Sequence, residues 1–177
     1  MIDVVDSPQM DESSRLEARR LWHAAFGDRF DDNDADHAFG GVHVLVREAG
    51  RLVGDASAVP RRLRFGDGPW RAVGYVEAVA VEPEWQRRGI GHRLMEVLQA
   101  EIAGRWPLAM LSTGRTTAFY ESLGWTQWRG LSYTLTASGS VVPDGEHGGL
   151  MVLVIDPSAE PDLDAAVTCE DRPGDAW

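Results

Sequence analysis

The sequence predicts an α/β (α+β) domain in which a central, mostly antiparallel mixed sheet is flanked by helices. Two observations lead to this prediction. Segments with apolar residues spaced like one helix face alternate along the chain with strand-like segments. Three of the strand-like segments follow one another with only short turns between them, as in an antiparallel meander. The 177 residues suit one compact domain, so we expect 1–177 to form a single domain.

The first half of the chain supplies a strand, a helix and then the meander. A short strand opens at Val4, and a helix capped by Ser13 or Ser14 covers about 13–26. The acidic stretch 27–37 is predicted to be a loop that enters a short helix, and a solvated surface loop is the alternative. The three strands of the meander are expected at 42–47, 52–65 and 70–81.

The second half begins with a glycine-containing turn and an amphipathic helix from Ile90 to about Gly104. The segments expected after it are a strand at 107–112, a helix at 116–123, a strand from the turn at 124–125 through Thr136, a loop at 137–149 and a strand at 150–155. The tail 156–177 is rich in Pro and Asp and shows little periodicity.

Composition excludes several classes of function. The net charge is −11, from 28 acidic and 17 basic residues, and such a field repels nucleic acids. Every basic residue is Arg, which excludes a Schiff-base lysine and a phosphate-binding lysine of the Walker type. The histidines show no metal-ligand spacing, so no metal is expected. His43, beside a strand start, is expected to be packed or hydrogen-bonded rather than a base.

The same sequence predicts a cytoplasmic protein without a membrane partner. Cys169 is the only cysteine and has no partner for an internal disulfide. Met1 leads into acidic residues rather than into a secretory signal. No apolar run approaches the roughly 20 residues that a membrane span needs.

The most informative segment is the strand 76–81 followed by a turn with two glycines and a helix. Backbone N–H groups of such a turn can point at one spot, where the helix dipole adds positive charge, so the turn suits a pyrophosphate. Arg87 and Arg88 supply mobile cations, while Gly89 and Gly91 keep side chains away from the amides. The spacing fits neither a Walker loop nor a dinucleotide fingerprint. A plain loop whose glycines cap the helix is the alternative.

This segment, V-x-P-x-x-Q-R-R-G-I-G at 81–91, resembles the acetyl-coenzyme A loop of the GNAT superfamily of N-acetyltransferases. The resemblance implies a GNAT fold with strands splayed at the acetyl-coenzyme A site, and acetyl-coenzyme A as the co-substrate. It implies that the preceding strand, at Val79, Ala80 and Val81, pairs with the pantetheine arm, and that the N–H of Val79 is the oxyanion donor. The pyrophosphate would be held by the loop residues Gln86, Arg87, Arg88, Gly89, Ile90 and Gly91.

A second segment, 116–125, resembles the other GNAT signature, a short helix that ends in Y-x-x-x-G-[FW]. In that family the tyrosine commonly sits beside the coenzyme sulfur. A phenol with an unperturbed pKa of about 10 can protonate a departing thiolate. Tyr120 is therefore the candidate general acid, and the alternative is that it only packs beside Phe119 and Trp125.

Four blocks, at 25–30, 40–43, 74–81 and 174–177, resemble the aminoglycoside 2′-N-acetyltransferases more narrowly. The resemblance implies that the tail 156–177 contributes to the acceptor site. The acceptor residues that it implies are Asp28, Glu77, Ala78, Ser112, an acid at Asp144 or Glu146, Asp175 and Trp177. The coenzyme turn, however, follows the ordinary GNAT pattern, and 144–146 does not align uniquely.

The expected activity is direct transfer of acetyl to the 2′-amine of an aminoglycoside in a ternary complex, giving antibiotic resistance, by a homodimer. Carboxylates on a chain of net charge −11 attract a polycationic sugar. One ammonium must lose its proton before attack, and Glu77 is the candidate base, with the Trp177 carboxylate as the alternative. Other possibilities are acetylation of a kasugamycin-type antibiotic, a polyamine or a protein N-terminus, or a non-catalytic coenzyme sensor.

Overall fold

A computed structural model describes residues 1–27, 30–114, 116–143 and 149–177. The chain divides into two compact units. One unit comprises Met1–Val59 and Val76–Gly104, and the other comprises Pro60–Tyr75 and Arg105–Trp177. The long strands β3 and β4 contribute residues to both units, so each unit has its own part of the sheet.

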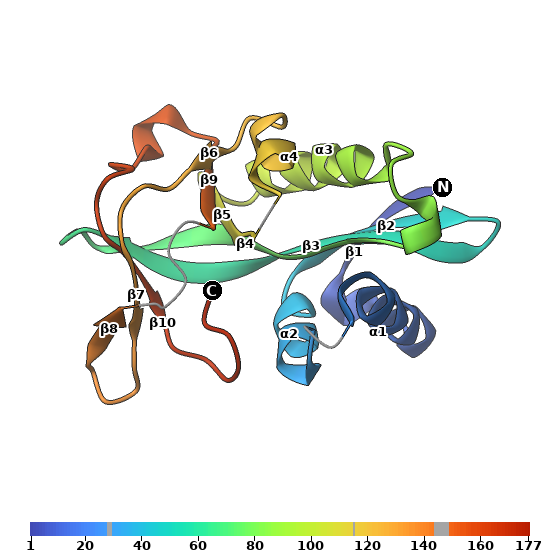
Figure 1. Cartoon of the computed structure of the whole chain (residues 1–177), viewed down its shortest axis with the longest axis horizontal. Coiled ribbons are helices and arrows are strands. Elements are labelled where there is room, and N and C mark those ends of the chain that lie inside the picture. Colours follow the sequence, from blue (N-terminus) through green and yellow to red (C-terminus); the bar gives the residue numbers. More distant parts are fainter. Residues whose placement is uncertain (28–29, 115, 144–148) are drawn as a thin grey trace. The chain divides into compact units, whose positions relative to one another are not determined.

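The first unit has helices on both faces of its part of the sheet (Figure 1). β2 pairs antiparallel with β3, as expected for the meander, and β1 pairs antiparallel with β2. The strand bounds are β1 Ile2–Asp6, β2 Val42–Glu48, β3 Arg51–Phe65 and β4 Trp70–Val81. The helices α1 and α2 cover one face and α3 covers the other. The helix bounds are η1 Ser7–Gln9, α1 Glu12–Phe26, α2 Asp32–Ala38, η3 Pro83–Trp85 and α3 Ile90–Ala103.

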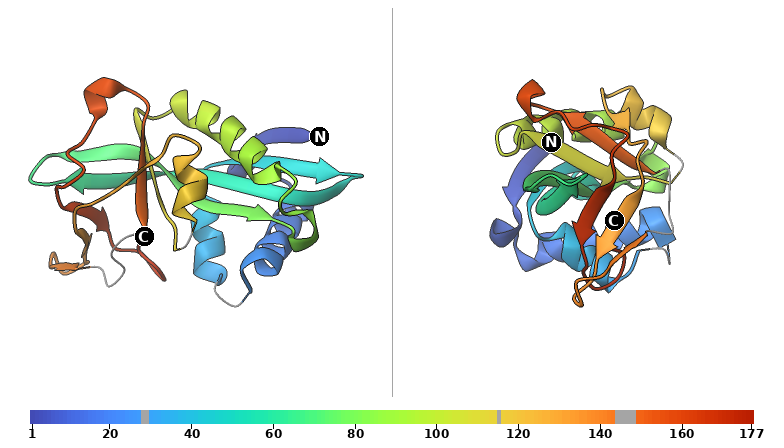
Figure 2. Two further views of the ribbon diagram at one scale, coloured as in Figure 1. Left: turned by 45° about the horizontal axis from the view of Figure 1, so that its top comes forward. Right: turned by 90° about the vertical axis from the view of Figure 1, so that its left-hand side faces the viewer.

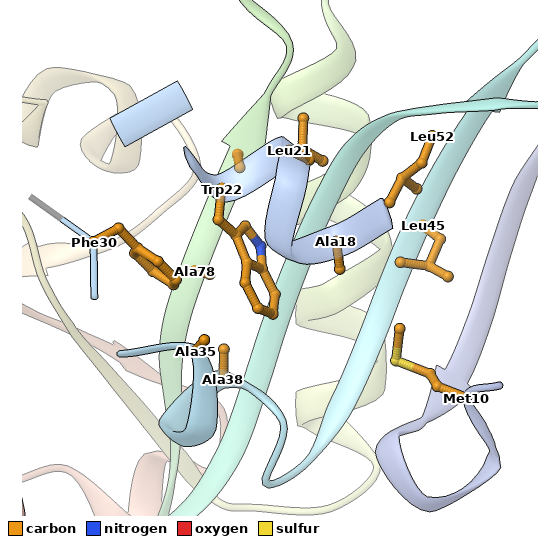
Figure 3. Packing of buried hydrophobic residues seen from close by; sticks show 11 residues of the cluster. Met10, Ala18, Leu21, Trp22, Phe30, Ala35, Ala38, Leu45, Leu52 and Ala78 are labelled. Atoms are coloured by element: carbon orange, nitrogen blue, oxygen red, sulfur yellow. The ribbon is translucent and has the colours of Figure 1, made fainter. Parts of the chain in front are cut away.

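Trp22 of α1 lies at the centre of the apolar cluster under α1 and α2 (Figure 3). Its ring centroid is 5.3 Å from that of Phe30 and 4.9 Å from that of Phe39. Ala78 and Ala80 of β4 complete the cluster from the sheet side, and both are buried. Burial of this apolar surface fixes which face of β4 points toward α1 and α2.

The caps of α1 and α2 use aspartates. Asp11, not the predicted Ser13 or Ser14, caps α1: its Oδ1 accepts from the Ser14 N–H at 2.7 Å. The helix therefore starts one residue earlier than predicted. Asp31 caps α2 by accepting from the backbone N–H groups of the first turn. The short helix expected in the acidic stretch is confirmed.

The second unit carries the remaining strands and a short helix, seen also in Figure 2. The strand order is β6-β9-β5-β4-β3-β10-β7-β8, with β10 antiparallel to β3 and parallel to β7. This mixture of directions and the helices confirm the predicted α/β (α+β) class. The bounds are β5 Leu108–Ser112, α4 Thr117–Glu121, β6 Thr126–Gln127, β7 Ser132–Leu135, β8 Val141–Pro143, β9 Leu150–Val154, η4 Pro157–Ala159 and β10 Val167–Glu170.

Two predictions for this unit were wrong. The strand expected through Thr136 is interrupted at 128–131, where the backbone N–H groups of Arg129 and Gly130 both donate to the carbonyl oxygen of Leu163 at 3.0 Å. The predicted loop 137–149 contains β8, which pairs with β7. The tail contains β10, a strand of four residues whose pairing partners lie far away in sequence. Within the described ranges, no helix is long and apolar enough to cross a membrane.

Candidate active site

The turn that follows β4 is fixed by contacts of its first residues. The N–H of Glu82 donates to the carbonyl oxygen of Val53 at 3.0 Å. The guanidinium of Arg51 bridges the carboxylates of Glu82 and Glu84, with an N–O distance of 2.8 Å to each. Because the turn is tied to β3 in this way, its backbone is set by the sheet.

The backbone of this turn bends twice through the left-handed region. Arg87 has a φ of 59° and Gly89 a φ of 78°, and Ile90 starts α3 directly afterward. Gly89 is the N-cap, so no side chain caps the helix, and a Cβ at Gly89 would meet no atom within 4 Å. Gly91 lies in the first turn of α3. Amide groups at such an uncapped N-terminus form a site for an anion such as a phosphate.

Two side chains of the turn hydrogen-bond to nearby backbone carbonyl groups. The guanidinium of Arg88 donates to the carbonyl oxygen of Glu84 at 3.0 Å and lies 4.9 Å from the centre of the Trp85 ring. The Nε2 of Gln86 donates to the carbonyl oxygen of Val81 at 3.1 Å. Arg88 thus has partners inside the turn, and the side chains of both Arg87 and Arg88 are exposed to solvent.

The predicted site residues of β4 alternate between its two faces. The side chains of Ala78 and Ala80 lie in the core cluster, and each is 1% exposed. Glu77, Val79 and Val81 lie on the opposite face and are only half-buried. Ala78 and Ala80 can therefore offer a ligand only their backbone atoms, whereas Glu77 can offer its carboxylate.

Tyr120 lies in α4, where it is packed against two aromatic rings. The ring centroid of Phe119 is 5.0 Å away, that of Trp125 is 6.1 Å away, and the N–H of Trp125 donates to the carbonyl oxygen of Tyr120 at 3.1 Å. Burial raises the pKa of the Tyr120 hydroxyl to about 12. Tyr120 therefore packs beside Phe119 and Trp125, and its hydroxyl keeps its proton throughout the neutral range.

The other predicted acceptor residues of the second unit lie at a strand end and in the tail. Ser112 is exposed at the end of β5, and the next residue, Thr113, donates its N–H to the carbonyl oxygen of Gly149 at 2.8 Å. Asp175 is exposed, and its Oδ1 accepts from the N–H of Trp177 at 2.9 Å. Asp28, Asp144 and Glu146 lie outside the described residues.

The predicted residues therefore form two groups. The turn 86–91 and its preceding strand residues 77–81 are continuous and belong to the first unit. Ser112, Tyr120, Asp175 and Trp177 belong to the second unit. Among the described residues, no group of three or more His, Cys, Asp or Glu side chains is placed to hold a metal ion.

The first unit also contains a buried serine–histidine–aspartate array, which no motif of the sequence predicts. The Nε2 of His43 lies 3.1 Å from the Oγ of Ser7, which itself donates to the carbonyl oxygen of Gly41 at 2.8 Å. Asp55 lies on the other side of the imidazole. Ser7 is 2% exposed and His43 is not exposed at all, so no substrate reaches the hydroxyl. The expectation that His43 is a hydrogen-bonded side chain is confirmed.

Comparisons with known proteins agree on one family. The Acetyltransferase (GNAT) domain family matches residues 9–128. An aminoglycoside 2′-N-acetyltransferase of Mycolicibacterium fortuitum is 36% identical over 177 residues, which cover 98% of this chain and 90% of the relative.

Solved structures add the fold. A GNAT family acetyltransferase of Brucella melitensis, in complex with acetyl-CoA, has a TM-score of 0.64 at 15% identity and covers 94% of each chain. The ribosomal-protein-S18-alanine N-acetyltransferase of Escherichia coli has a TM-score of 0.61 at 19% identity, covering 90% of this chain and 97% of its own. At these identities the two structures establish the fold alone.

Proposed function

This chain belongs to the GNAT family of acetyltransferases, and from that premise we propose that it transfers acetyl from acetyl-coenzyme A to the 2′-amine of aminoglycoside antibiotics. The observation that carries the proposal is the similarity, over nearly the whole chain, to an enzyme named for that reaction. The enzyme acts as an N-acetyltransferase whose co-substrate is acetyl-coenzyme A. The 2′ position is taken from the relative.

The coenzyme's pyrophosphate binds, in this proposal, at the turn before α3. The left-handed backbone at Arg87 and Gly89 and the absence of a capping side chain support this assignment, because they leave amide donors for an anion. Arg88, whose guanidinium lies over the Trp85 ring, adds a positive charge near these amides. The strand residues 79–81 bind the pantetheine arm through backbone atoms.

The acceptor is held by acidic and polar side chains. A sugar that carries several ammonium groups is attracted to a chain of net charge −11, and the carboxylates of Glu77 and Asp175 are charged partners for two of those groups. Ser112, exposed at its strand end, offers a neutral hydrogen-bond partner. Asp28, an acid at Asp144 or Glu146, and Trp177 complete the proposed set.

The chemistry is a direct attack in a ternary complex. Glu77 takes a proton from the 2′-ammonium, and the freed lone pair forms the C–N bond at the thioester carbonyl. The N–H of Val79 donates to the oxyanion that develops. The C–S bond then breaks, and the Tyr120 hydroxyl protonates the departing thiolate. The nitrogen loses its second proton as the amide forms, and this proton returns the Tyr120 phenolate to its hydroxyl form. Trp177 is the alternative base.

Thiol release tests this proposal. We would measure the appearance of coenzyme A with an aminoglycoside that has a 2′-amine and with a matched congener that has a 2′-hydroxyl. Release with the amine alone is the expected result, and equal rates would contradict the assignment of position 2′. Tight binding of acetyl-coenzyme A without any product over a panel of amines, including kasugamycin and polyamines, would support the sensor alternative instead.

The proposal extends to the setting of the enzyme. The chain acts as a single catalytic domain in the cytoplasm, where acetyl-coenzyme A is available, and confers resistance to its substrates. It forms a homodimer. Exposed Val141 and Val142 on β8, at the end of the strand order, support an interface there, since such strand edges pair with other chains. Light scattering on purified protein distinguishes a dimer from a monomer.

A further inference from the structure

The chain turns back on β10 immediately after that strand ends. β10 ends at Glu170, Gly174 has a φ of 78°, and the carbonyl oxygen of Ala176 accepts from the Sγ of Cys169 at 3.5 Å. We call residues 171–177 the hook. The far end of the hook therefore contacts the middle of the strand from which the hook starts.

Hydrogen bonds within the hook fix the two residues assigned to the acceptor. The Nε of Arg172 donates to the carbonyl oxygen of Asp175 at 3.0 Å, and the Oδ1 of Asp175 accepts from the N–H of Trp177. The side chain of Trp177 is buried, with 8% of the residue exposed. Asp175 itself is exposed. The hook thus holds an exposed carboxylate on a segment that is anchored at Trp177.

Cys169 ties the far end of the hook to the sheet, while at its near end the N–H of Asp171 donates to the carbonyl oxygen of Leu135 of β7 at 3.0 Å. Cys169 occupies the interior of β10, opposite Leu63 of β3 on one side and Thr134 of β7 on the other, and it is not exposed to solvent. The Oγ1 of Thr134 lies 3.6 Å from its Sγ. Burial raises the pKa of the thiol, so at neutral pH the sulfur carries its proton and can donate it to Ala176.

We propose that Cys169 is a positioning residue for the acceptor, which holds Asp175 and Trp177 in their binding conformation through the carbonyl group of Ala176. This inference rests on the proposed function, in which those two residues bind the aminoglycoside. Cys169 is not a nucleophile, because its sulfur is buried and protonated. Its effect is therefore confined to affinity for the acceptor.

Steady-state kinetics of three variants tests the proposal. Cys169→Ala removes the donor and is expected to raise KM for the aminoglycoside about threefold to tenfold, the effect of losing one neutral hydrogen bond. KM for acetyl-coenzyme A and kcat stay within about twofold in that variant. Cys169→Ser keeps a donor and is expected to restore most of the aminoglycoside affinity. Val167→Ala, which also removes buried volume from β10, is the matched control and leaves both KM values near those of the parent.

Alkylation gives a readout that does not depend on turnover. Cys169 is the only cysteine, so iodoacetamide labelling followed by mass spectrometry reports on this sulfur alone. We expect slow labelling that a saturating aminoglycoside slows further, by about threefold or more, and that acetyl-coenzyme A does not change. We expect Gly174→Ala to accelerate labelling, because a side chain strains the left-handed backbone at this position and loosens the hook.

The possible failures are distinguishable. If the parent enzyme releases no thiol with any 2′-amino aminoglycoside, the proposed function fails. If the parent is active but Cys169→Ala behaves like Val167→Ala, or shifts both KM values equally, the positioning role is wrong. Labelling that an aminoglycoside leaves unchanged, although calorimetry shows that it binds, contradicts the positioning role as well.

Discussion

The Nδ1 of His43 lies 3.1 Å from the Oδ1 of Asp55, and neither side chain is exposed to solvent. The two residues come from neighbouring strands, β2 and β3, and their ring and carboxylate lie among apolar groups such as Trp22, whose ring centroid is 6.2 Å from that of His43. A buried polar group is stable only while its partner is present, because water cannot replace the partner. The pair therefore specifies how the first unit folds rather than what it catalyses.

Removing one partner of this pair should destabilise the protein strongly. Asp55→Ala leaves the imidazole of His43 buried with one hydrogen bond fewer, and we expect the free energy of unfolding to fall by about 3 kcal/mol. Asp164→Ala is the control: it breaks the exposed ion pair with Arg129, and solvent screens that pair, so little change is expected. Urea denaturation measures both. Equal losses in the two variants would show that burial does not set the cost of breaking the His43–Asp55 pair.

The coenzyme turn can be tested with two glycines that share one backbone conformation. Gly89 and Gly50 have φ values of 78° and 84°, and a Cβ at either position would meet no atom within 4 Å. Alanine at each position should therefore cost a similar free energy of unfolding, about 1 kcal/mol, from left-handed strain alone. Only Gly89→Ala should also raise KM for acetyl-coenzyme A, by about fivefold or more, because it changes the amides of the turn. If KM for acetyl-coenzyme A rose similarly in Gly50→Ala, the rise in Gly89→Ala would be due to general destabilisation rather than to the turn.

The sequence predicts the first unit well because its signals are local. Apolar alternation places the strands of the meander nearly at their observed bounds, and the glycine turn marks the start of α3 at Ile90. The exception is the cap of α1. Asp11, Ser13 and Ser14 are all good capping residues. Which of them caps α1 depends on where the preceding helix η1 ends.

The second unit is harder to predict because its signals are not local. β10 has four residues, and it becomes a strand by pairing with β3, about 100 residues earlier in the chain, and with β7. The hydrogen bond from Cys169 to Ala176 has no sequence pattern either, because it depends on the reversal at Gly174. For the site, the family motifs identify the candidate residues. They do not show that the side chain of Ala78 is buried in the core, because this depends on its packing in the cluster under α1 and α2.

The base assignment can be tested through the pH dependence of turnover. Glu77→Gln keeps the size of the side chain but cannot accept the ammonium proton, so kcat/KM for the aminoglycoside should fall by about 100-fold to 10,000-fold. The loss should be largest at low pH, where most of the 2′-amine is protonated and needs a base, and smaller at high pH, where free amine is abundant. Glu48→Gln, at the end of β2, is a control that should leave the pH profile unchanged. A loss independent of pH would assign Glu77 to binding instead.

The assignment of Tyr120 as the general acid depends on its hydroxyl group alone. Substitution by phenylalanine removes that hydroxyl and nothing else. Tyr120→Phe keeps the ring that packs against Phe119 and Trp125, so affinity for acetyl-coenzyme A should not change, while thiol release should slow by about 10-fold to 100-fold. Because burial raises the pKa of Tyr120 to about 12, its hydroxyl stays about 99% protonated at pH 10. The parent enzyme should therefore lose no activity through this group as pH rises from 7 to about 10.

Tyr133→Phe, on β7 of the same unit, is the control for removal of a tyrosine hydroxyl and should leave thiol release unchanged. A large loss of coenzyme affinity in Tyr120→Phe would assign the hydroxyl to coenzyme binding. An activity loss below pH 10 that disappears in this variant would contradict a buried phenol with a raised pKa, because it would require a hydroxyl that ionises in that range. Rapid-mixing measurement of thiol release between pH 6 and about 10 distinguishes these outcomes, since it follows the step in which the phenol donates its proton.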